Sequence, residues 1–163
     1  MGNSIQSQLL WAKTLLKSQK NSLTPDLDAE VLLSFVLKKN RSYLYTWPDV
    51  FLSDSDLFHY RQIITRRSHG EPIAYLTGSR EFWSLEFFVT PDVLIPRPET
   101  ELLVQAVLDH SPQTHSPFYI ADFGTGSGVI AIALAKENPQ WKIFAMDQSH
   151  QALLTASQNI QRH

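Results

Sequence analysis

Glycine is scarce in this chain, and half of it lies in one short segment. The 163 residues include six glycines, and three of them, Gly124, Gly126 and Gly128, fall within five positions. Glycine has no Cβ, so it permits left-handed backbone and lets another group approach the main chain closely. An apolar run at residues 118–123 precedes the segment, and a helical pattern at 129–136 follows it. A strand, a glycine-rich turn and a helix in this order predict a nucleotide-binding βαβ unit.

The second half of this unit ends in a carboxylate. Residues 141–146 are expected to form a second strand, and Asp147 follows directly. A carboxylate about twenty residues after the glycines can accept hydrogen bonds from ribose hydroxyls, while the N–H groups of the turn and the helix N-terminus face the ligand. The spacing leaves NAD and FAD open, because Gly126, Gly128 and Ala131 also fit the dinucleotide form. Without a ligand, the glycines would make a sharp strand-to-helix turn and Asp147 would only shape the next loop.

Asp122 favours one ligand over the others. It lies at the carboxyl end of the first predicted strand, two residues before Gly124, where a ligand enters such a unit. A carboxylate there would repel a pyrophosphate, but it suits S-adenosylmethionine, which carries a cationic amino group and a sulfonium. The alternative is that Asp122 merely caps the following turn. The predicted cofactor-binding residues are Asp122, Gly124, Thr125, Gly126, Ser127, Gly128 and Asp147.

The composition excludes several classes of protein and site. The chain has no cysteine, which excludes a disulfide scaffold, a cysteine-liganded zinc site and a cysteine nucleophile. Its six histidines show no metal-ligand spacing with acidic residues, so no metal site is expected. Because there is no apolar run of about eighteen residues and no basic, apolar leader, we expect no membrane span and a cytoplasmic location.

The first part of the chain is predicted to be helical. Apolar residues recur at helical spacing over residues 4–19, 24–40 and 53–70, and a short helical turn is expected at 43–47. No convergent catalytic groups occur there. Residues 1–80 carry ten Lys or Arg against seven Asp or Glu, whereas residues 81–163 carry four against nine. This asymmetry indicates two modules, although a solvated helical surface explains the mildly basic first part better than an acidic or RNA partner does.

The pattern changes after Pro72. Residues 80–90 are aromatic and β-branched, which predicts a β-hairpin. Glu99 and Glu101 place acids in the first turn of a helix, and a loop at 110–117 follows it. After the βαβ unit, a last helix is expected at 151–162. The helix that begins near Glu99 carries the apolar residues Leu102, Leu103, Ala106 and Val107.

Four segments together resemble one family. They are Glu-Pro-Ile-Ala-Tyr-Leu-Thr-Gly at 71–78, Arg-Glu-Phe-Trp at 80–83, Leu-Ile-Pro-Arg-Pro-Glu-Thr-Glu at 94–101 and Asp-Phe-Gly-Thr-Gly-Ser-Gly at 122–128. In residue identity, order and spacing they strongly resemble the bacterial release-factor glutamine methyltransferases of the PrmC/HemK type. Residues 71–101 are the family-specific part, because many methyltransferases share the glycine motif, and the first 70 residues match only in helical character.

The resemblance implies a multidomain α and α/β fold. It implies a small N-terminal helical bundle for substrate recognition at 1–72, a linking β-hairpin region at 73–96, and the first βαβα of a Rossmann-like class I methyltransferase domain at 97–163. It also implies S-adenosylmethionine as cofactor and methylation of the glutamine side-chain amide in the Gly-Gly-Gln motif of class I peptide-chain release factors. The expected protein is a monomer that contacts neither nucleic acid nor a membrane directly.

One motif of the family is missing. The family carries an Asn-Pro-Pro-Tyr motif some forty residues beyond the equivalent of Asp147, where it holds the target amide, but the sequence stops at His163. The chain therefore looks truncated, is assigned no catalytic residue and is expected to be inactive and poorly stable alone. Two alternatives remain: a nucleic-acid amino-group methyltransferase, against which residues 71–101 argue, and a noncatalytic binding module.

Overall fold

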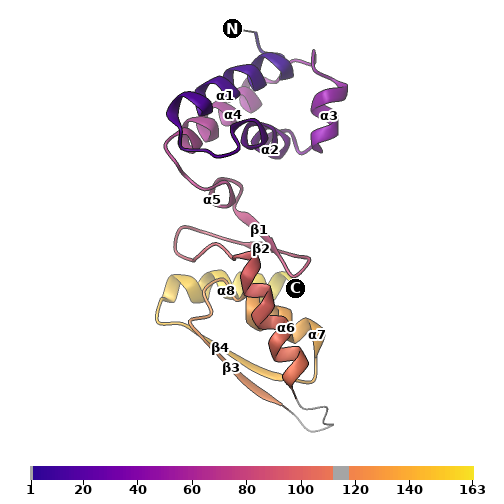
Figure 1. Cartoon of the computed structure of the whole chain (residues 1–163), viewed down its shortest axis with the longest axis vertical. Helices are drawn as coiled ribbons and strands as arrows, with labels where there is room; N and C mark the ends of the chain where they lie inside the picture. The colour runs from indigo at the N-terminus through magenta and orange to yellow at the C-terminus, as the bar shows by residue number, and fades with distance from the viewer. Residues whose placement is uncertain (1, 112–117) are drawn as a thin grey trace. The chain divides into compact units, whose positions relative to one another are not determined.

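The chain divides into two compact units. A computed structural model describes residues 2–111 and 118–163, so the predicted loop at 110–117 lies largely outside the described residues. The first unit is Met1–Thr77 and the second is Gly78–His163. Figure 1 shows helices in the first unit and both helices and strands in the second. None of the helices in the described ranges combines the length and apolar character that a membrane span requires.

The first unit is a helical bundle, as the apolar periodicity predicts. Side chains of Ser4, Asn40 and Ser53 each accept a hydrogen bond from a backbone N–H in the first turn of the helix that follows, and so fix where these helices begin. The helices are α1 Ile5–Gln19, α2 Pro25–Leu37, α3 Arg41–Thr46, α4 Asp54–Ser68 and α5 Ile73–Thr77.

Helix α5 is the one element of this unit that the sequence pattern did not predict. It begins directly after Pro72, whose carbonyl accepts hydrogen bonds from the N–H groups of Tyr75 and Leu76. The side chain of Leu76 is buried in the core of the bundle with Ile64 and Leu32. Five residues are too few for a helical periodicity to emerge, and packing against the bundle stabilises the turn. The expected linker region at 73–96 therefore begins with a helix.

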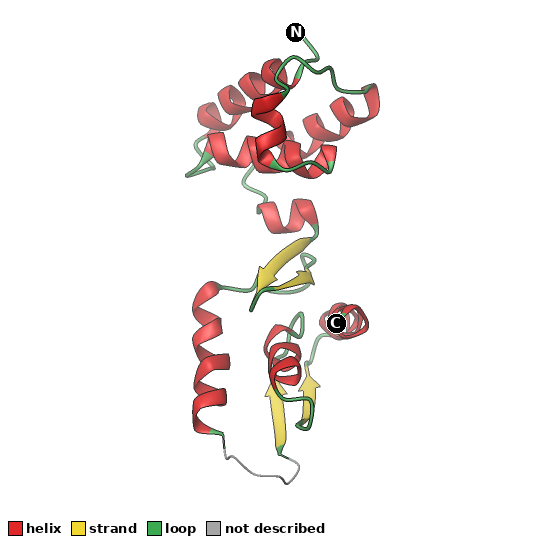
Figure 2. Ribbon diagram, turned by 90° about the vertical axis from the view of Figure 1, so that its right-hand side faces the viewer, coloured by secondary structure: helices red, strands yellow, loops and turns green. Residues whose placement is uncertain are grey.

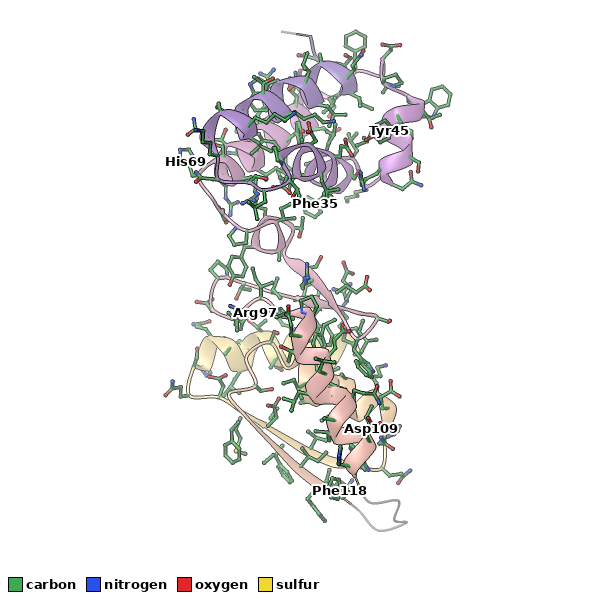
Figure 3. All side chains as sticks on the ribbon, viewed as in Figure 1. Phe35, Tyr45, His69, Arg97, Asp109 and Phe118 are labelled. Atoms are coloured by element: carbon green, nitrogen blue, oxygen red, sulfur yellow. The ribbon has the colours of Figure 1, made fainter. Side chains whose placement is uncertain are left out.

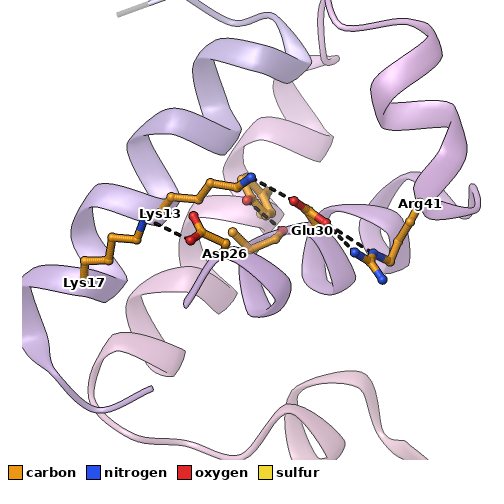
Figure 4. A network of polar contacts seen from close by, with 7 residues as sticks. Lys13, Lys17, Asp26, Glu30 and Arg41 are labelled. Atoms are coloured by element: carbon orange, nitrogen blue, oxygen red, sulfur yellow. Dashed lines mark hydrogen bonds and ion pairs between the residues drawn. The ribbon is translucent and has the colours of Figure 1, made fainter. Parts of the chain in front are cut away.

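A buried carboxylate joins three helices of the bundle (Figure 4). The side chain of Glu30 on α2 is 5% exposed and bonds the Lys13 ammonium of α1 at 2.8 Å and the Arg41 guanidinium of α3 at 2.7 Å. Burial disfavours the charged form, but hydrogen bonds from Lys13, Tyr45 and Arg41 outweigh it and lower the pKa of Glu30 to about 2. The carboxylate therefore stays ionised at neutral pH and fixes α1 and α3 on α2.

Replacing Glu30 by glutamine removes this charge and keeps the size of the side chain. We expect Glu30→Gln to lower the free energy of unfolding of the first unit by about 2 kcal/mol, the order for hydrogen bonds to a charged group. Asp26→Asn is the matched control, because the Asp26–Lys17 pair is more than half exposed on both sides, and such pairs contribute about 0.5 kcal/mol. The stability of both variants is measured by urea unfolding, with hydrogen exchange of the amides in α1 and α2 as the probe. Equal losses of unfolding free energy in the two variants would contradict the role given to Glu30.

The pKa of Glu30 also predicts a pH dependence. The folded pKa is about 2 and the ordinary value is 4.5. The stabilisation is therefore fully present above pH 4.5 and is lost as the pH falls from 4.5 toward 2, because the unfolded chain takes up the proton first. We expect the melting temperature of the wild-type chain to fall more steeply over this window than that of Glu30→Gln. Parallel declines in thermal scans of the two proteins would refute this.

The second unit contains two separate two-stranded sheets. The predicted hairpin is confirmed as β1 Ser79–Phe82 and β2 Leu85–Phe88, which pair antiparallel. The predicted βαβ unit is confirmed as β3 Tyr119–Phe123, α7 Val129–Glu137 and β4 Lys142–Met146, and Figure 2 shows its two strands side by side. These strands are parallel, with Tyr119 opposite Lys142 and Phe123 opposite Met146. The remaining elements are η1 Pro98–Thr100, α6 Glu101–His110 and α8 His150–Arg162.

The hairpin turn is made by two residues that are not glycine. Trp83 and Ser84 both have left-handed backbone, with φ of 52° and 57°, as a tight two-residue hairpin turn requires. Two acidic residues hold the tryptophan: the Trp83 N–H donates to Glu101 of α6 at 2.8 Å, and its indole N–H donates to Glu137 of α7 at 2.7 Å. The hairpin is thereby fastened to the helices of the second unit.

The parallel sheet has one covered and one exposed face. Ile120 and Ile143 point toward α7 and join the core around Phe82, Phe87 and Val104. On α6, Val104 is buried whereas Leu102 and Leu103 are exposed. The opposite face of the sheet presents four large apolar side chains that are at least 39% exposed, namely Tyr119, Phe123, Phe144 and Met146.

Candidate functional site

The glycine turn between β3 and α7 needs glycine for two different reasons. Gly124, Gly126 and Gly128 all have left-handed backbone, with φ of 77°, 56° and 82°. At Gly124 and Gly126 no heavy atom lies within 4 Å of the position that a Cβ would take. At Gly128 that position is 3.2 Å from Ile132 Cδ1 and 3.3 Å from Ala156 Cβ. The first two glycines leave open space above the turn, and the third permits close packing of α8.

Most N–H groups of the turn already have partners inside the chain. The Met146 carbonyl accepts from the N–H groups of Gly124 and Thr125 at 2.8 and 2.9 Å. The Gly126 N–H donates to Asp147 Oδ2 at 2.9 Å, and the Gly128 N–H donates to the Thr125 carbonyl at 2.8 Å. This differs from the expected arrangement, in which these donors face a ligand. The turn thus offers close approach to its backbone rather than a row of free donors.

Two carboxylates flank this turn. Asp147 follows β4, and its oxygens accept from the N–H groups of Gly126 and Ser149, each at 2.9 Å. These backbone hydrogen bonds, led by that of Ser149, hold the pKa of Asp147 below its ordinary value. Asp122, at the end of β3, accepts the Thr125 hydroxyl at 2.7 Å. The loop-shaping and turn-capping roles that the sequence suggested for these aspartates are therefore present, and both side chains are only partly buried.

The other two predicted residues are buried. Thr125 is 6% exposed and Ser127 is 2% exposed, so their side chains belong to the interior of the turn. Of the predicted cofactor-binding residues, Gly128 lines an apolar groove of about 310 Å³ beside α7 and β4, whereas Asp122 and Asp147 lie outside that groove. The two carboxylates and the open glycines instead share the surface at the carboxyl ends of β3 and β4.

Sequence reasoning missed one residue of this region, Asn159 on α8. Its side chain is fully buried and donates to the Ser127 carbonyl at 2.8 Å. The buried positions of α8 are Ala152, Thr155, Ala156 and Asn159, which follow helical spacing. The sequence does carry a signal for Asn159: it ends a row of small residues at helical spacing, and an amide on the buried face of a helix needs specific hydrogen-bond partners.

Comparisons with known proteins match both units. The family model of the PrmC N-terminal domain matches residues 8–78, and that of the methyltransferase small domain matches residues 98–163. A Coxiella burnetii protein named release factor glutamine methyltransferase is 51% identical over 142 residues, covering 87% of this chain and 51% of that protein. Proteins of the same name from Shewanella oneidensis and Escherichia coli are 44% and 42% identical, over 95% and 93% of this chain and 53% and 54% of their own lengths.

Over nearly all of its length the chain is similar to release factor glutamine methyltransferases, both by these two family models and by relatives at 42–51% identity. The resemblance inferred from residues 71–101 and 122–128 is thereby confirmed. The chain spans about half the length of the relatives it matches. The helical bundle corresponds to the N-terminal domain of the family, and α6 through α8 correspond to the beginning of the methyltransferase small domain.

The two kinds of glycine give a matched pair of substitutions. Gly124→Ala introduces only left-handed strain, so we expect it to destabilise the second unit by about 1 kcal/mol. Gly128→Ala has the same strain and also forces its Cβ against Ile132 and Ala156. Overpacking of this kind lowers the free energy of unfolding by about 1–3 kcal/mol more. Urea unfolding followed by hydrogen exchange in α7 and α8 measures the difference. Equal destabilisation by the two substitutions would show that α8 does not pack on Gly128.

Proposed function

We propose that this chain acts in S-adenosylmethionine-dependent methylation of the glutamine side-chain amide in the Gly-Gly-Gln motif of class I peptide-chain release factors. Its part is to bind the cofactor at the carboxyl ends of β3 and β4, through residues 124–128, Asp122 and Asp147. The observation that carries this proposal is the open backbone over Gly124 and Gly126 between two carboxylates. The names of the relatives support glutamine methylation and a release factor as substrate, and the Gly-Gly-Gln motif and class I come from the family resemblance.

The residues present fit this cofactor. The oxygens of Asp147 accept backbone N–H groups, among them those of Gly126 and Ser149, and a carboxylate has about four acceptor positions, which leaves capacity for a ribose hydroxyl. Asp122 supplies negative charge next to the open glycines, which favours a cationic amino group and a sulfonium over the pyrophosphate of NAD or FAD. Because Gly124 and Gly126 have no Cβ, a flat part of the ligand can lie directly on the turn.

The roles of this chain's residues are binding and orientation. When bound, S-adenosylmethionine supplies a methyl group made electrophilic by the adjacent sulfonium. Asp147 and the glycine turn hold the nucleoside part, and Asp122 places a negative charge near the cationic part. We assign no residue of this chain to the attacking amide nitrogen or to its proton, because the sequence contains no Asn-Pro-Pro-Tyr motif. The family resemblance implies that the Asn-Pro-Pro-Tyr motif orients the target amide toward the methyl group.

The helical bundle is proposed as the part that recognises the release factor, with domain bounds of 1–72 for recognition, 73–96 for the hairpin linker and 97–163 for the methyltransferase portion. Large side chains exposed on the bundle support this role. They include Tyr45 on α3, labelled in Figure 3, and Trp47, Phe51 and Phe58, each at least 54% exposed. Aromatic side chains of this kind are enriched at protein–protein interfaces.

Asp147→Asn tests the cofactor site directly. The amide keeps one oxygen to accept a backbone N–H but loses the charge and one acceptor oxygen. Loss of a charged hydrogen bond to the ligand predicts a dissociation constant for S-adenosylmethionine at least about tenfold higher. Isothermal titration calorimetry of the 163-residue chain measures it. Asp109→Asn, on the exposed surface of α6 (Figure 3), is the matched control and is expected to bind as the wild type does.

Three results would count against the proposed site. The first is an unchanged dissociation constant for Asp147→Asn. The second is tighter binding of NAD than of S-adenosylmethionine by the wild-type chain, because the charge argument for Asp122 would then fail. If the wild-type chain bound neither ligand, the alternative of a module without a cofactor would describe it better.

A further inference from the structure

Asn159 has a buried side-chain amide whose bonding groups are all engaged. It is fully buried on α8. Its Oδ1 accepts from the Phe88 N–H at 2.7 Å, and its Nδ2 donates to the carbonyls of Phe88 at 3.0 Å and Ser127 at 2.8 Å. A primary amide has two N–H donors, and both are satisfied here. Because a buried amide is costly without such partners, the position requires an amide in this orientation.

The hydrogen bond to Ser127 acts on the turn before α7. The Ser127 carbonyl and the Gly128 N–H belong to one planar peptide unit. Asn159 bonds the carbonyl of this unit, and the Thr125 carbonyl accepts its N–H at 2.8 Å. The peptide plane is therefore held on both sides. Its orientation sets the left-handed conformation of Gly128, from which α7 begins.

A second contact between α8 and the turn is independent of this hydrogen bond. Ala156 lies one helical turn before Asn159, on the same face of α8. A Cβ at Gly128 would lie 3.3 Å from Ala156 Cβ, so α8 and the turn are in close contact there. Ala152 and Thr155 are also buried on α8. Small side chains bring the helix close to the turn, and Asn159 supplies the polar contact that small side chains cannot.

The same amide also reaches the hairpin. Phe88 is the last residue of β2, and Asn159 both accepts from its N–H and donates to its carbonyl. The end of α8 adds an ion pair between Arg162 and Glu86 and a contact of 3.0 Å between His163 Nε2 and the Glu86 carbonyl. One side chain thus connects the hairpin with the peptide that precedes Gly128.

We infer that Asn159 is a positioning residue, which fixes the Ser127–Gly128 peptide against the hairpin and so holds the glycine turn in its binding geometry. The inference rests on the proposed function, since the turn is the proposed cofactor site. Asn159 acts through the turn and not by touching the ligand, because its amide is fully used inside the protein. The effect of its loss must therefore appear both in cofactor affinity and in the turn itself.

Two variants of Asn159 separate the hydrogen bonds. Asn159→Leu keeps the branched shape and the number of side-chain heavy atoms and removes all three, whereas Asn159→Asp keeps an acceptor for the Phe88 N–H but cannot donate to the two carbonyls when ionised. We expect each variant to raise the dissociation constant for S-adenosylmethionine at least about tenfold in calorimetry. Gln158→Leu, at an exposed position of α8, is the control for loss of an amide and is expected to bind as the wild type does.

A stability-matched control distinguishes positioning from general support of the fold. Val104 is fully buried on α6 in the core of the second unit, and Val104→Ala lowers the melting temperature through a cavity. We expect Val104→Ala to leave the dissociation constant within about twofold of wild type, as a folded site keeps its affinity. If the Asn159 variants lost no more affinity than Val104→Ala at an equal loss of melting temperature, the inference would be wrong.

Amide hydrogen exchange in the ligand-free chain provides a measurement that does not depend on the cofactor. We expect the Gly126 and Gly128 amides to exchange faster in the Asn159 variants, relative to Leu134 inside α7, whereas Val104→Ala changes all three alike. If the wild-type chain did not bind S-adenosylmethionine, the proposed function would fail, and the exchange of these two glycines alone would decide the inference. Unchanged exchange would overturn it.

A measurement on the wild-type chain covers the case in which both Asn159 variants fail to fold. The Nδ2 protons of Asn159 should be protected from exchange with water, unlike those of the exposed Gln158. A scalar coupling between Asn159 Nδ2 and the Ser127 carbonyl carbon, transmitted through the hydrogen bond that the carbonyl oxygen accepts, would support the inference. Side-chain amide exchange as fast as that of Gln158 would overturn it.

Discussion

The glycine turn between β3 and α7 depends on a segment that comes later in the chain. Its left-handed residues cannot satisfy their backbone groups within a regular helix or strand. Besides the Thr125 carbonyl within the turn, the partners of the turn's backbone groups are the Met146 carbonyl, the Asp147 carboxylate and the Asn159 amide. The two side-chain partners lie 21 and 32 positions away from the groups they bond. The turn therefore reaches its final geometry only when β4 and α8 are in place, so the proposed cofactor site is a property of the whole βαβα segment.

In the helical bundle, apolar contacts alone would let the helices slide along one another, so polar contacts are needed to fix their relative positions. Both buried carboxylates are on α2. Asp28 accepts from Arg67 of α4 at 2.7 Å and from the hydroxyls of Ser22 and Thr24 at 2.6 and 3.0 Å, while Glu30 reaches α1 and α3. Buried ion pairs add little net stability compared with apolar replacements, but removing one partner is costly. Their effect here is to specify one arrangement of α1, α3 and α4 around α2.

The sequence predicted the elements well where a local rule applied. The apolar stripes marked the helices of the bundle, and the spacing from the glycines to Asp147 marked the βαβ unit. The sequence pattern did not predict helix α5, because this helix is stabilised by the packing of Leu76 in the bundle and is too short to show a periodicity. The partners of the turn's N–H groups and the role of Asn159 were not predicted either, for a related reason. Each depends on which distant groups the folded chain brings together, and no spacing rule reports that.

The hydrogen bonds that hold the glycine turn do not use the side chains on the exposed face of the parallel sheet. The groups that bond the glycine turn are backbone atoms, Asp147 and residues of α8. The exposed side chains Tyr119 and Phe144 stack on each other across β3 and β4, with ring centroids 6.5 Å apart, and take no part in those bonds. The turn's own hydrogen bonds are therefore complete without any cover on that face. Methyl transfer requires a group that orients the amide nitrogen in addition to a bound cofactor, so cofactor binding and methyl transfer can be measured separately.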